Sequence, residues 1–246
     1  MSRPLLAAAC RILAARGLAD GFLGHVSQRA GDELLLVRCR GPMERGLAFT
    51  EPADIRLVTF DGGPGAPGEL DGYVPPNELP LHAEVLRRRP EVAAVVHAHP
   101  AAVVAADLAG IAIRPVVGAY DIPGAALARG GVPVYPRGVL VRDRELAGEM
   151  TAAMGDRPVV LLRGHGLTSA APSVEQAVLQ AVSVDRIAAL SLAVRSAGGT
   201  LADLPDADLD QLPDLGAGFT VAVAWRHELA RIGDEPVHTM PLGSLP

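Results

Sequence analysis

The sequence contains no lysine: all 22 residues with a fixed positive side-chain charge are arginine. Because a guanidinium stays protonated and is a poor nucleophile, it cannot take over the covalent roles of an amine. Schiff-base catalysis through a side-chain amine is therefore excluded. A pyridoxal phosphate held on a lysine and a P-loop lysine are excluded as well.

Aromatic residues and clustered positive charge are also scarce. Phe, Trp and Tyr together make up 3% of the 246 residues, and the formal net charge is −6, with acidic and basic residues interspersed. Nucleic-acid binding relies on basic stripes or aromatic stacking platforms, so no nucleic-acid partner is expected. The two cysteines, Cys10 and Cys39, do not suggest a disulfide framework.

Long apolar runs and a leader sequence are missing too. No apolar run approaches the roughly 20 residues that a membrane span needs. The N-terminus is short and amphipathic, with arginines spread through it, and it has neither the apolar region nor the cleavage site of a signal peptide. We therefore expect no membrane partner and a cytoplasmic location.

Hydrophobic residues make up 49% of the chain, enough to bury a sizeable core. Helices and strands alternate, which is typical of a layered α/β domain. We expect one domain over residues 1–232 and a C-terminal tail over 233–246. The expected helices are 4–17, 77–89 with Asn77 as its cap, 101–108, 142–155, 173–197 with Ser173 as its cap, and 219–231. The expected strands are 32–38, 54–60, 92–99, 113–117, 133–135 and 158–162.

The most informative stretch is 92–99, which reads VAAVVHAH. Alternate side chains of a strand point to the same face, so His97 and His99 project in parallel from the end of a buried strand. Two imidazoles placed in this way form half of a metal site.

A third histidine supplies a candidate for the other half. His165 follows the apolar strand 158–162 and lies between Gly164 and Gly166, which permit a sharp turn and a close backbone approach. Three protein ligands leave coordination positions open, as in catalytic rather than structural metal sites. The alternative is that the three histidines are unrelated.

Glu78 stands at the start of the helix that precedes the histidine pair, with His82 one turn later on the same face. Its carboxylate could reach a metal or a substrate carbon, or it could only complement the helix dipole. Residues 24–27, GHVS, and the segment 38–42 could form a backbone nest for an anion, or plain turns.

These pieces, in this order, resemble the class II aldolase/adducin family, which contains fuculose-phosphate aldolase and ribulose-phosphate 4-epimerase. The resemblance runs from about residue 4 to residue 200. It rests on GHVS at 24–27, NELPLHAEVLRRRPEVAAVVHAHP at 77–100, Gly-His-Gly at 164–166 and the helix start SVEQAV. It implies a three-layer α/β/α domain with a largely antiparallel central sheet. It also implies a homo-oligomer, commonly a tetramer, with active sites at subunit interfaces.

The resemblance also implies roles for single residues. His97, His99 and His165 match the family's metal ligands. Glu78 matches its catalytic acid/base, which can also sit on the metal when no substrate is bound. The family metal is usually zinc, with manganese, cobalt or iron in some members. Tyr120 falls roughly where aldolases place a catalytic tyrosine donated by the neighbouring subunit.

The chain departs from the sugar-phosphate members around their phosphate site. Those members read GN-[IV]-S, T-P-[ST]-G and S-S-E. Here His25 replaces the asparagine, residues 38–41 replace the second motif, and Pro76 and Asn77 replace the two serines. Proline has no hydroxyl and no backbone N–H. Several phosphate donors are lost together, so we predict that the substrate is not a sugar phosphate.

Two arginines stand in the altered region. Arg38 and Arg40 could clamp a carboxylate, since guanidinium pairs with carboxylates bidentately, or they could form a solvated or ion-paired strand edge. The roles of His25 and His227 stay open between the substrate pocket and the surface. The residues predicted to contact the substrate are His25, Ser27, Arg38, Arg40, Gly41 and Asn77.

We therefore expect a divalent-metal-dependent carbon–carbon lyase acting on a non-phosphorylated small molecule. Related proteins with GHVS-type sequences include decarboxylases of dihydroxylated aromatic acids. Decarboxylation of a hydroxylated aromatic carboxylate of the 3,4-dihydroxyphthalate type is favoured. The alternatives are aldol cleavage of a small hydroxy-keto compound or a sugar phosphate, epimerisation, iron-dependent oxygenation, and a non-catalytic adducin-like module.

Overall fold

The computed structural model describes residues 2–213 and 217–234. Its centre is a seven-stranded sheet with the strand order β3-β2-β1-β4-β7-β6-β5. The strands are β1 (His25–Arg29), β2 (Leu34–Arg38), β3 (Ile55–Thr59), β4 (Ala94–Ala98), β5 (Val134–Tyr135), β6 (Val159–Leu162) and β7 (Gly166–Ala171). Neighbouring strands are antiparallel except β5 and β6, which are parallel. The expected largely antiparallel sheet is confirmed.

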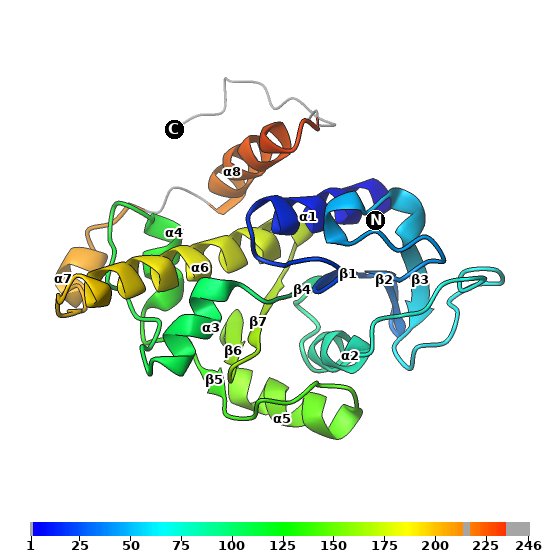
Figure 1. Ribbon diagram of the computed structural model, residues 1–246, viewed down its shortest axis with the longest axis horizontal. Helices are drawn as coiled ribbons and strands as arrows, with labels where there is room; N and C mark the ends of the chain where they lie inside the picture. The colour runs from blue at the N-terminus through cyan, green and yellow to red at the C-terminus, as the bar shows by residue number, and fades with distance from the viewer. Residues whose placement is uncertain (1, 214–216, 235–246) are drawn as a thin grey trace.

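Helices cover both faces of this sheet. They are α1 (Arg3–Ala15), α2 (Leu79–Arg88), α3 (Ala101–Leu108), α4 (Ile122–Ala128), α5 (Arg144–Met154), α6 (Val174–Ser196), α7 (Asp206–Leu209) and α8 (Ala217–Arg231), with 3-10 turns at Leu47–Phe49 and Pro52–Asp54. In Figure 1, α1 and α6 lie on one side of the sheet and α2 and α5 on the other. The three-layer α/β/α expectation is therefore correct.

The strand β4 contributes side chains to two apolar cores, one on each face of the sheet. Ala94, Val96 and Ala98 join the apolar cluster of α1, α3 and α6, whereas Val95 joins the cluster of α2 and α5. Because side chains alternate between the faces of a strand, His97 shares the face of Val95. The histidine pair therefore opens toward α2 and α5.

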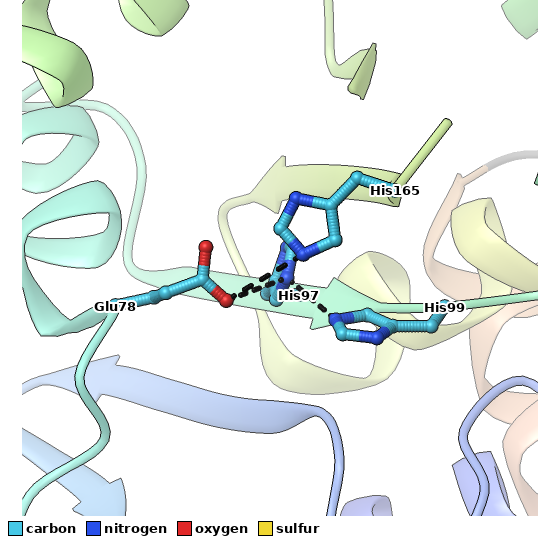
Figure 2. Close-up of side chains that lie close together, drawn as sticks. All are labelled: Glu78, His97, His99 and His165. Carbon is cyan, nitrogen blue, oxygen red and sulfur yellow. Dashed lines mark hydrogen bonds and ion pairs between the residues drawn. The ribbon is translucent and has the colours of Figure 1, made fainter. Parts of the chain in front are cut away.

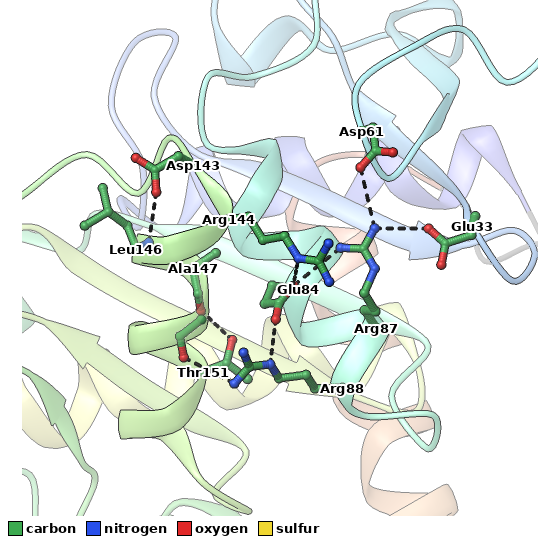
Figure 3. A network of polar contacts seen from close by, with 11 residues as sticks. Glu33, Asp61, Glu84, Arg87, Arg88, Asp143, Arg144, Leu146, Ala147 and Thr151 are labelled. Atoms are coloured by element: carbon green, nitrogen blue, oxygen red, sulfur yellow. Dashed lines mark hydrogen bonds and ion pairs between the residues drawn. The ribbon is translucent and has the colours of Figure 1, made fainter.

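A buried carboxylate ties α2 to α5 and so fixes the helix that follows Glu78 (Figure 3). Glu84 is 4% exposed and accepts a 2.5 Å hydrogen bond from Nε of Arg88. Arg87 lies 3.4 Å away on the same helix, and Arg144 approaches to 3.5 Å from α5. Several partners compensate this charge, as a buried carboxylate requires.

The helix α6 is the longest of the described helices. By length and composition alone this helix could cross a membrane, but half of its apolar stretch is buried inside the protein, as in the core helix of a globular domain. The Ser173 side chain caps it as expected, by accepting a hydrogen bond from the backbone N–H of Gln176 at 3.2 Å. Its apolar residues serve the core under β4 and β7.

Several sequence-based expectations are wrong at the level of elements. Residues 113–117 form no strand: Pro115 cannot donate to a ladder, and the N–H of Val116 bonds to the carbonyl of Arg114 at 2.8 Å. The helix α2 has Glu78 rather than Asn77 at its N-cap position, with no side-chain cap. Residues 24–27 form neither a nest nor a plain turn, since β1 begins at His25.

Two further strands and two helices escaped sequence reasoning, namely β1, β7, α4 and α7. The expected C-terminal helix is present as α8 and packs on α6 and α1. Arg16, the C-cap residue of α1, forms a two-point ion pair with the buried carboxylate of Glu228 in α8. Most of the expected tail, 235–246, lies outside the described residues.

Candidate metal centre

Three imidazoles and one carboxylate converge at the end of β4 (Figure 2). One ligand atom from each of Glu78, His97, His99 and His165 lies within 4.8 Å of the others. The four residues come from three separate parts of the chain: the start of α2, the end of β4 and the turn between β6 and β7. The structure thus brings together the acid/base and the three metal ligands that the sequence predicted.

The turn that carries His165 depends on its two glycines. Gly164 has φ +59°, and its N–H bonds to the Asp107 carboxylate at 2.8 Å. At Gly166 the chain runs so close to β4 that an added Cβ would lie 2.2 Å from the carbonyl oxygen of Ala98. This close approach sets the His165 ring 4.7 Å, centroid to centroid, from the ring of His99.

Glu78 reaches the cluster from the opposite side. Its Oε2 lies 3.3 Å from Nε2 of His97 and 3.7 Å from Nε2 of His165. Its Oε1 accepts a hydrogen bond from the backbone N–H of Val141 at 2.9 Å. One oxygen is therefore anchored to the fold, and the other faces the imidazoles.

The protonation states suit a cation. Burial raises the pKa of Glu78. Its bond to His97, the charges of the neighbouring imidazoles and the Val141 N–H together outweigh that effect and lower the pKa to about 2. Burial lowers the pKa of His99 to about 3 and also lowers the pKa of His165. At neutral pH the carboxylate is ionised and these two imidazoles are neutral, as metal ligands must be.

The spacing of the donor atoms fits a single divalent ion. Nε2 of His99 lies 2.8 Å from Nε2 of His97. At zinc–nitrogen distances of about 2.0–2.1 Å, two donors of one tetrahedral ion lie about 3.4 Å apart. The distances within the cluster fall on both sides of that value. The donor set of imidazole nitrogens and a carboxylate oxygen therefore suits a divalent metal ion.

Behind the cluster runs a buried polar chain that sequence reasoning missed. Ser27 Oγ lies 2.7 Å from Nδ1 of His82, and Nε2 of His82 lies 2.6 Å from Nδ1 of His25. The His25 ring stacks on His97 with the centroids 5.1 Å apart. Burial lowers the pKa of His82 to about 3 and lowers that of His25 well below its usual value. The sequence signal was the position of His82, one turn after Glu78.

A cleft of about 160 Å³ opens beside the cluster. Glu78, His99 and His25 form part of its wall, so His25 belongs to the pocket and not to the outer surface. The remaining lining combines polar and apolar residues: Arg38, Arg40, Asn77, Phe22, Leu23, Gly24, Pro76 and Leu140.

The two arginines of the cleft are in different states. Arg38 is 5% exposed, and its guanidinium pairs with the Glu44 carboxylate and donates to Thr50 Oγ1 at 3.2 Å. This matches the ion-paired alternative. Arg40 is half-buried as a residue, and its guanidinium has no hydrogen-bond or ion-pair partner within residues 2–213 and 217–234.

Of the other predicted site residues, only some line the cleft. Asn77 lines the cleft, but Ser27 is fully buried behind His25. Gly41 lies under the Tyr73 ring, where an added Cβ would be 2.8 Å from a ring carbon, and it does not line the cleft. Tyr120 is 67% exposed. It lines, with His227, a separate cavity of about 840 Å³ between α4, α6 and α8, and it does not reach the cluster of Glu78 and the three histidines.

Comparison with known proteins gives a consistent assignment. The family model described as "Class II Aldolase and Adducin N-terminal domain" matches residues 4–192. A 3,4-dihydroxyphthalate decarboxylase of Arthrobacter keyseri is 72% identical over 94% of both chains. A protein of the same name from Rhodococcus jostii is 61% identical over 94% of this chain and 95% of the relative.

A solved structure supports the fold independently. The crystal structure of an aldolase II superfamily protein from Pseudomonas syringae superposes with a TM-score of 0.78, at 23% identity, over 94% of this chain and 91% of that chain. At that identity the likeness concerns the fold. Taken with the match over residues 4–192, it shows that the chain belongs to the class II aldolase and adducin family.

Proposed function

We propose that this protein is a divalent-metal-dependent lyase that decarboxylates 3,4-dihydroxyphthalate or a closely related dihydroxylated aromatic acid. The observation that carries the proposal is the complete cluster of Glu78, His97, His99 and His165 beside a cleft, in a chain so similar to decarboxylases of that substrate. The metal ligands are His97, His99 and His165, and Glu78 is the acid/base.

The cleft suits a flat aromatic acid. Phe22, Leu23, Pro76 and Leu140 supply apolar surface for the faces of a ring. The polar side chains of Arg40, Asn77 and His25 line the same cleft. An aromatic ring can therefore lie on the apolar residues while its carboxylates and hydroxyls contact the polar ones. Burying the ring there also displaces water from the reacting carbon.

Decarboxylation needs a sink for the electron pair that CO₂ leaves behind. A divalent ion held by three imidazoles supplies a Lewis acid for the substrate's oxygens. The carboxylate that leaves is the one beside a ring hydroxyl, because the electron pair can then move toward that oxygen. The product from 3,4-dihydroxyphthalate is 3,4-dihydroxybenzoate.

Glu78 moves the proton in this scheme. Its ionised carboxylate accepts the proton of the hydroxyl beside the leaving group and passes it to the ring carbon that bears that group. The C–C bond then breaks, CO₂ departs, and the electron pair restores the aromatic ring. The ring oxygen is left as a phenolate and takes a proton from water, so the overall reaction consumes one proton.

His25 serves as a hydrogen-bonding wall of the cleft. Its Nδ1 is committed to His82, which leaves Nε2 for the substrate's oxygens. The buried pair of Ser27 and His82 fixes the orientation of this ring. Ser27 thus contributes through His82 and not by contact with the substrate.

We further propose that the ion is zinc, with manganese, cobalt or iron as the other options, because imidazole and carboxylate donors suit zinc in catalytic sites. We keep residues 1–232 as one domain, and a cytoplasmic location stays a prediction.

We also keep the homotetramer as a proposal. Phe22, Leu23 and Leu140 line the cleft and are 58%, 42% and 45% exposed, which supports a subunit contact at its mouth. In such an assembly Tyr120 would serve a neighbouring subunit's site. The molar mass in solution tests this: a tetramer has about four times the 25.4 kDa of one chain.

The decisive experiment measures CO₂ release from 3,4-dihydroxyphthalate by the full chain loaded separately with zinc, manganese, cobalt or iron. We expect stoichiometric CO₂ and 3,4-dihydroxybenzoate with at least one metal, and loss of both on chelation. The matched control is His97→Ala under the same conditions. Cleavage of a hydroxy-keto compound or a sugar phosphate with no CO₂ from the aromatic acid would overturn the proposal in favour of an aldolase.

A further inference from the structure

The backbone of Arg40 is fixed at the rim of the cleft. Its N–H donates to the carbonyl of Val74, and the N–H of Val74 donates back to the carbonyl of Arg40, both at 2.9 Å. This bridge joins the segment after β2 to the loop that leads into Pro76 and Glu78. The side chain of Arg40 therefore starts from a hydrogen-bonded point of the backbone, and it lines the same cleft as Glu78.

The charge of Arg40 is the one in the cleft wall that the described part of the chain leaves unmatched. Arg38 is neutralised by Glu44, and Glu78 lies against His97 and His165. Arg40 is half-buried as a residue, and its charged group gains no anionic partner in return for the hydration that partial burial removes. A planar fork of N–H donors in this state is organised for an incoming carboxylate.

The proposed substrate carries two neighbouring carboxylates, of which one leaves as CO₂ and one stays. An ion pair with the leaving carboxylate would stabilise the ground state more than the transition state, because its charge moves into the ring as the C–C bond breaks. An ion pair with the carboxylate that stays holds the substrate equally in both states. The unmatched guanidinium therefore favours the reaction only if it binds the carboxylate that stays on the ring.

We infer that Arg40 is the specificity-determining residue that binds the retained carboxylate, so that the site selects aromatic ortho-dicarboxylates over monocarboxylates. The inference rests on the proposed decarboxylase function. It also separates the two arginines: Arg40 binds substrate, whereas Arg38 braces the cleft wall through Glu44 and Thr50.

The test compares two substrates on the metal-loaded wild type and on Arg40→Gln. 3,4-Dihydroxyphthalate has both carboxylates, and 2,3-dihydroxybenzoate has the leaving carboxylate and both hydroxyls but lacks the retained one. We expect the wild type to prefer the diacid in kcat/KM by on the order of 10²-fold, the effect of one charge-assisted hydrogen-bonded pair. Arg40→Gln should lose that preference through a higher KM for the diacid, with kcat/KM for the monoacid nearly unchanged.

Two further variants sharpen the result. Arg40→Lys should restore part of the preference, because it keeps the charge and loses the bidentate fork. Arg142→Gln removes an exposed arginine that lines a neighbouring cavity and not this cleft, so it should leave the preference unchanged. Metal content and thermal midpoint equal to the wild type confirm that each variant is folded.

Three outcomes would overturn the inference. If the wild type turns over both acids equally well, no residue of the site recognises the retained carboxylate. Equal losses on both acids in Arg40→Gln would show a general role in folding or binding. If the wild type releases no CO₂ from either acid with any metal, the proposed function itself fails and the inference falls with it.

Discussion

Glu78 and the three histidines are held by the fold in different ways. His97 lies within β4, and His99 follows that strand directly, whereas Glu78 stands at the junction of a loop and α2. Its anchored oxygen accepts a hydrogen bond that a neutral amide oxygen could also accept. The carboxylate can therefore be neutralised without removing the bond that positions it.

Glu78→Gln tests the proton-transfer role. The variant should keep its metal, since three imidazoles remain, and should lose turnover by on the order of 10²-fold or more, the usual contribution of a positioned acid/base. Elemental analysis and the rate of CO₂ release give the two readouts. Full activity would remove Glu78 from the mechanism.

His97→Ala is the matched control at the same cluster. It deletes a ligand in the middle of the cluster, so metal and activity should disappear together. A variant that retains stoichiometric metal would show that His97 is not a ligand.

The pair of His97 and His99 could be predicted from sequence because its arrangement is local, whereas His165 was added to it on its glycine-flanked turn and the family resemblance. The alternation of a strand places His97 and His99 on one face without knowledge of the rest of the fold. The contact of His25 with His82 could not be predicted in this way, because 57 residues separate them and it arises only when β1 pairs with β4 beside α2. For the same reason, sequence alone could not tell the paired Arg38 from Arg40.

The turn between β6 and β7 is the element on which the position of His165, the third proposed ligand, depends. β7 pairs with both β4 and β6, and its first residue, Gly166, leaves no room for a side chain against Ala98. The strand also places Thr168 Oγ1 at 3.3 Å from Nδ1 of His97, so it supports both His97 and His165. Displacing the start of β7 should move His165 away from the other imidazoles.

Gly166→Ala should therefore weaken metal binding as well as stability. The added Cβ meets backbone atoms that cannot move without separating β7 from β4. We expect at least a tenfold loss of metal affinity, measured by competition with a chelating dye, and a lower thermal midpoint by calorimetry.

Gly155→Ala provides the matched control, because Gly155 has φ +56° and no atom within 4 Å of an added Cβ. Backbone strain alone should cost about 1–3 kcal/mol there, with metal affinity unchanged. Unchanged metal affinity in Gly166→Ala would show that the close approach does not position His165.

The elements that could be predicted are those with clear start and stop signals or a clear residue pattern in the sequence. Helices α1 and α6 begin at serine caps and are followed by glycines, and β4 is a β-branched run. The strand β7 has the small-residue sequence GLTSAA and is buried along its whole length, so no alternation of polar and apolar residues marks it. Only its place between β4 and β6 makes it a strand.

Across the whole molecule, two apolar cores on opposite faces of one sheet determine stability, and few charges lie within them. Asp185 on α6 is an exception with an electrostatic cost. Burial raises the pKa of this half-buried carboxyl to about 6, against the lowering effect of Arg186. A carboxyl with a raised pKa favours the folded state when it is protonated, so its contribution is largest below pH 4 and is lost as the pH rises to about 6.

Asp185→Asn should remove that loss. The variant should match the wild type near pH 4 and be more stable above pH 6, by on the order of 1 kcal/mol, because partial exposure screens the charge. Urea denaturation from pH 4 to pH 8 measures the difference. Asp156→Asn, at an exposed position, should show no such trend. A gain that is equal at every pH would contradict the electrostatic account.

The place of β4 in the sheet has a consequence for how the protein fluctuates. Strands on both sides, β1 and β7, bond to its backbone along its length. Amide hydrogens in such a position exchange with solvent only when the sheet opens, whereas terminal elements fray in smaller, cheaper events. The frame that carries His97 should therefore be among the slowest-exchanging parts of the chain, and local opening at the periphery should reach it last.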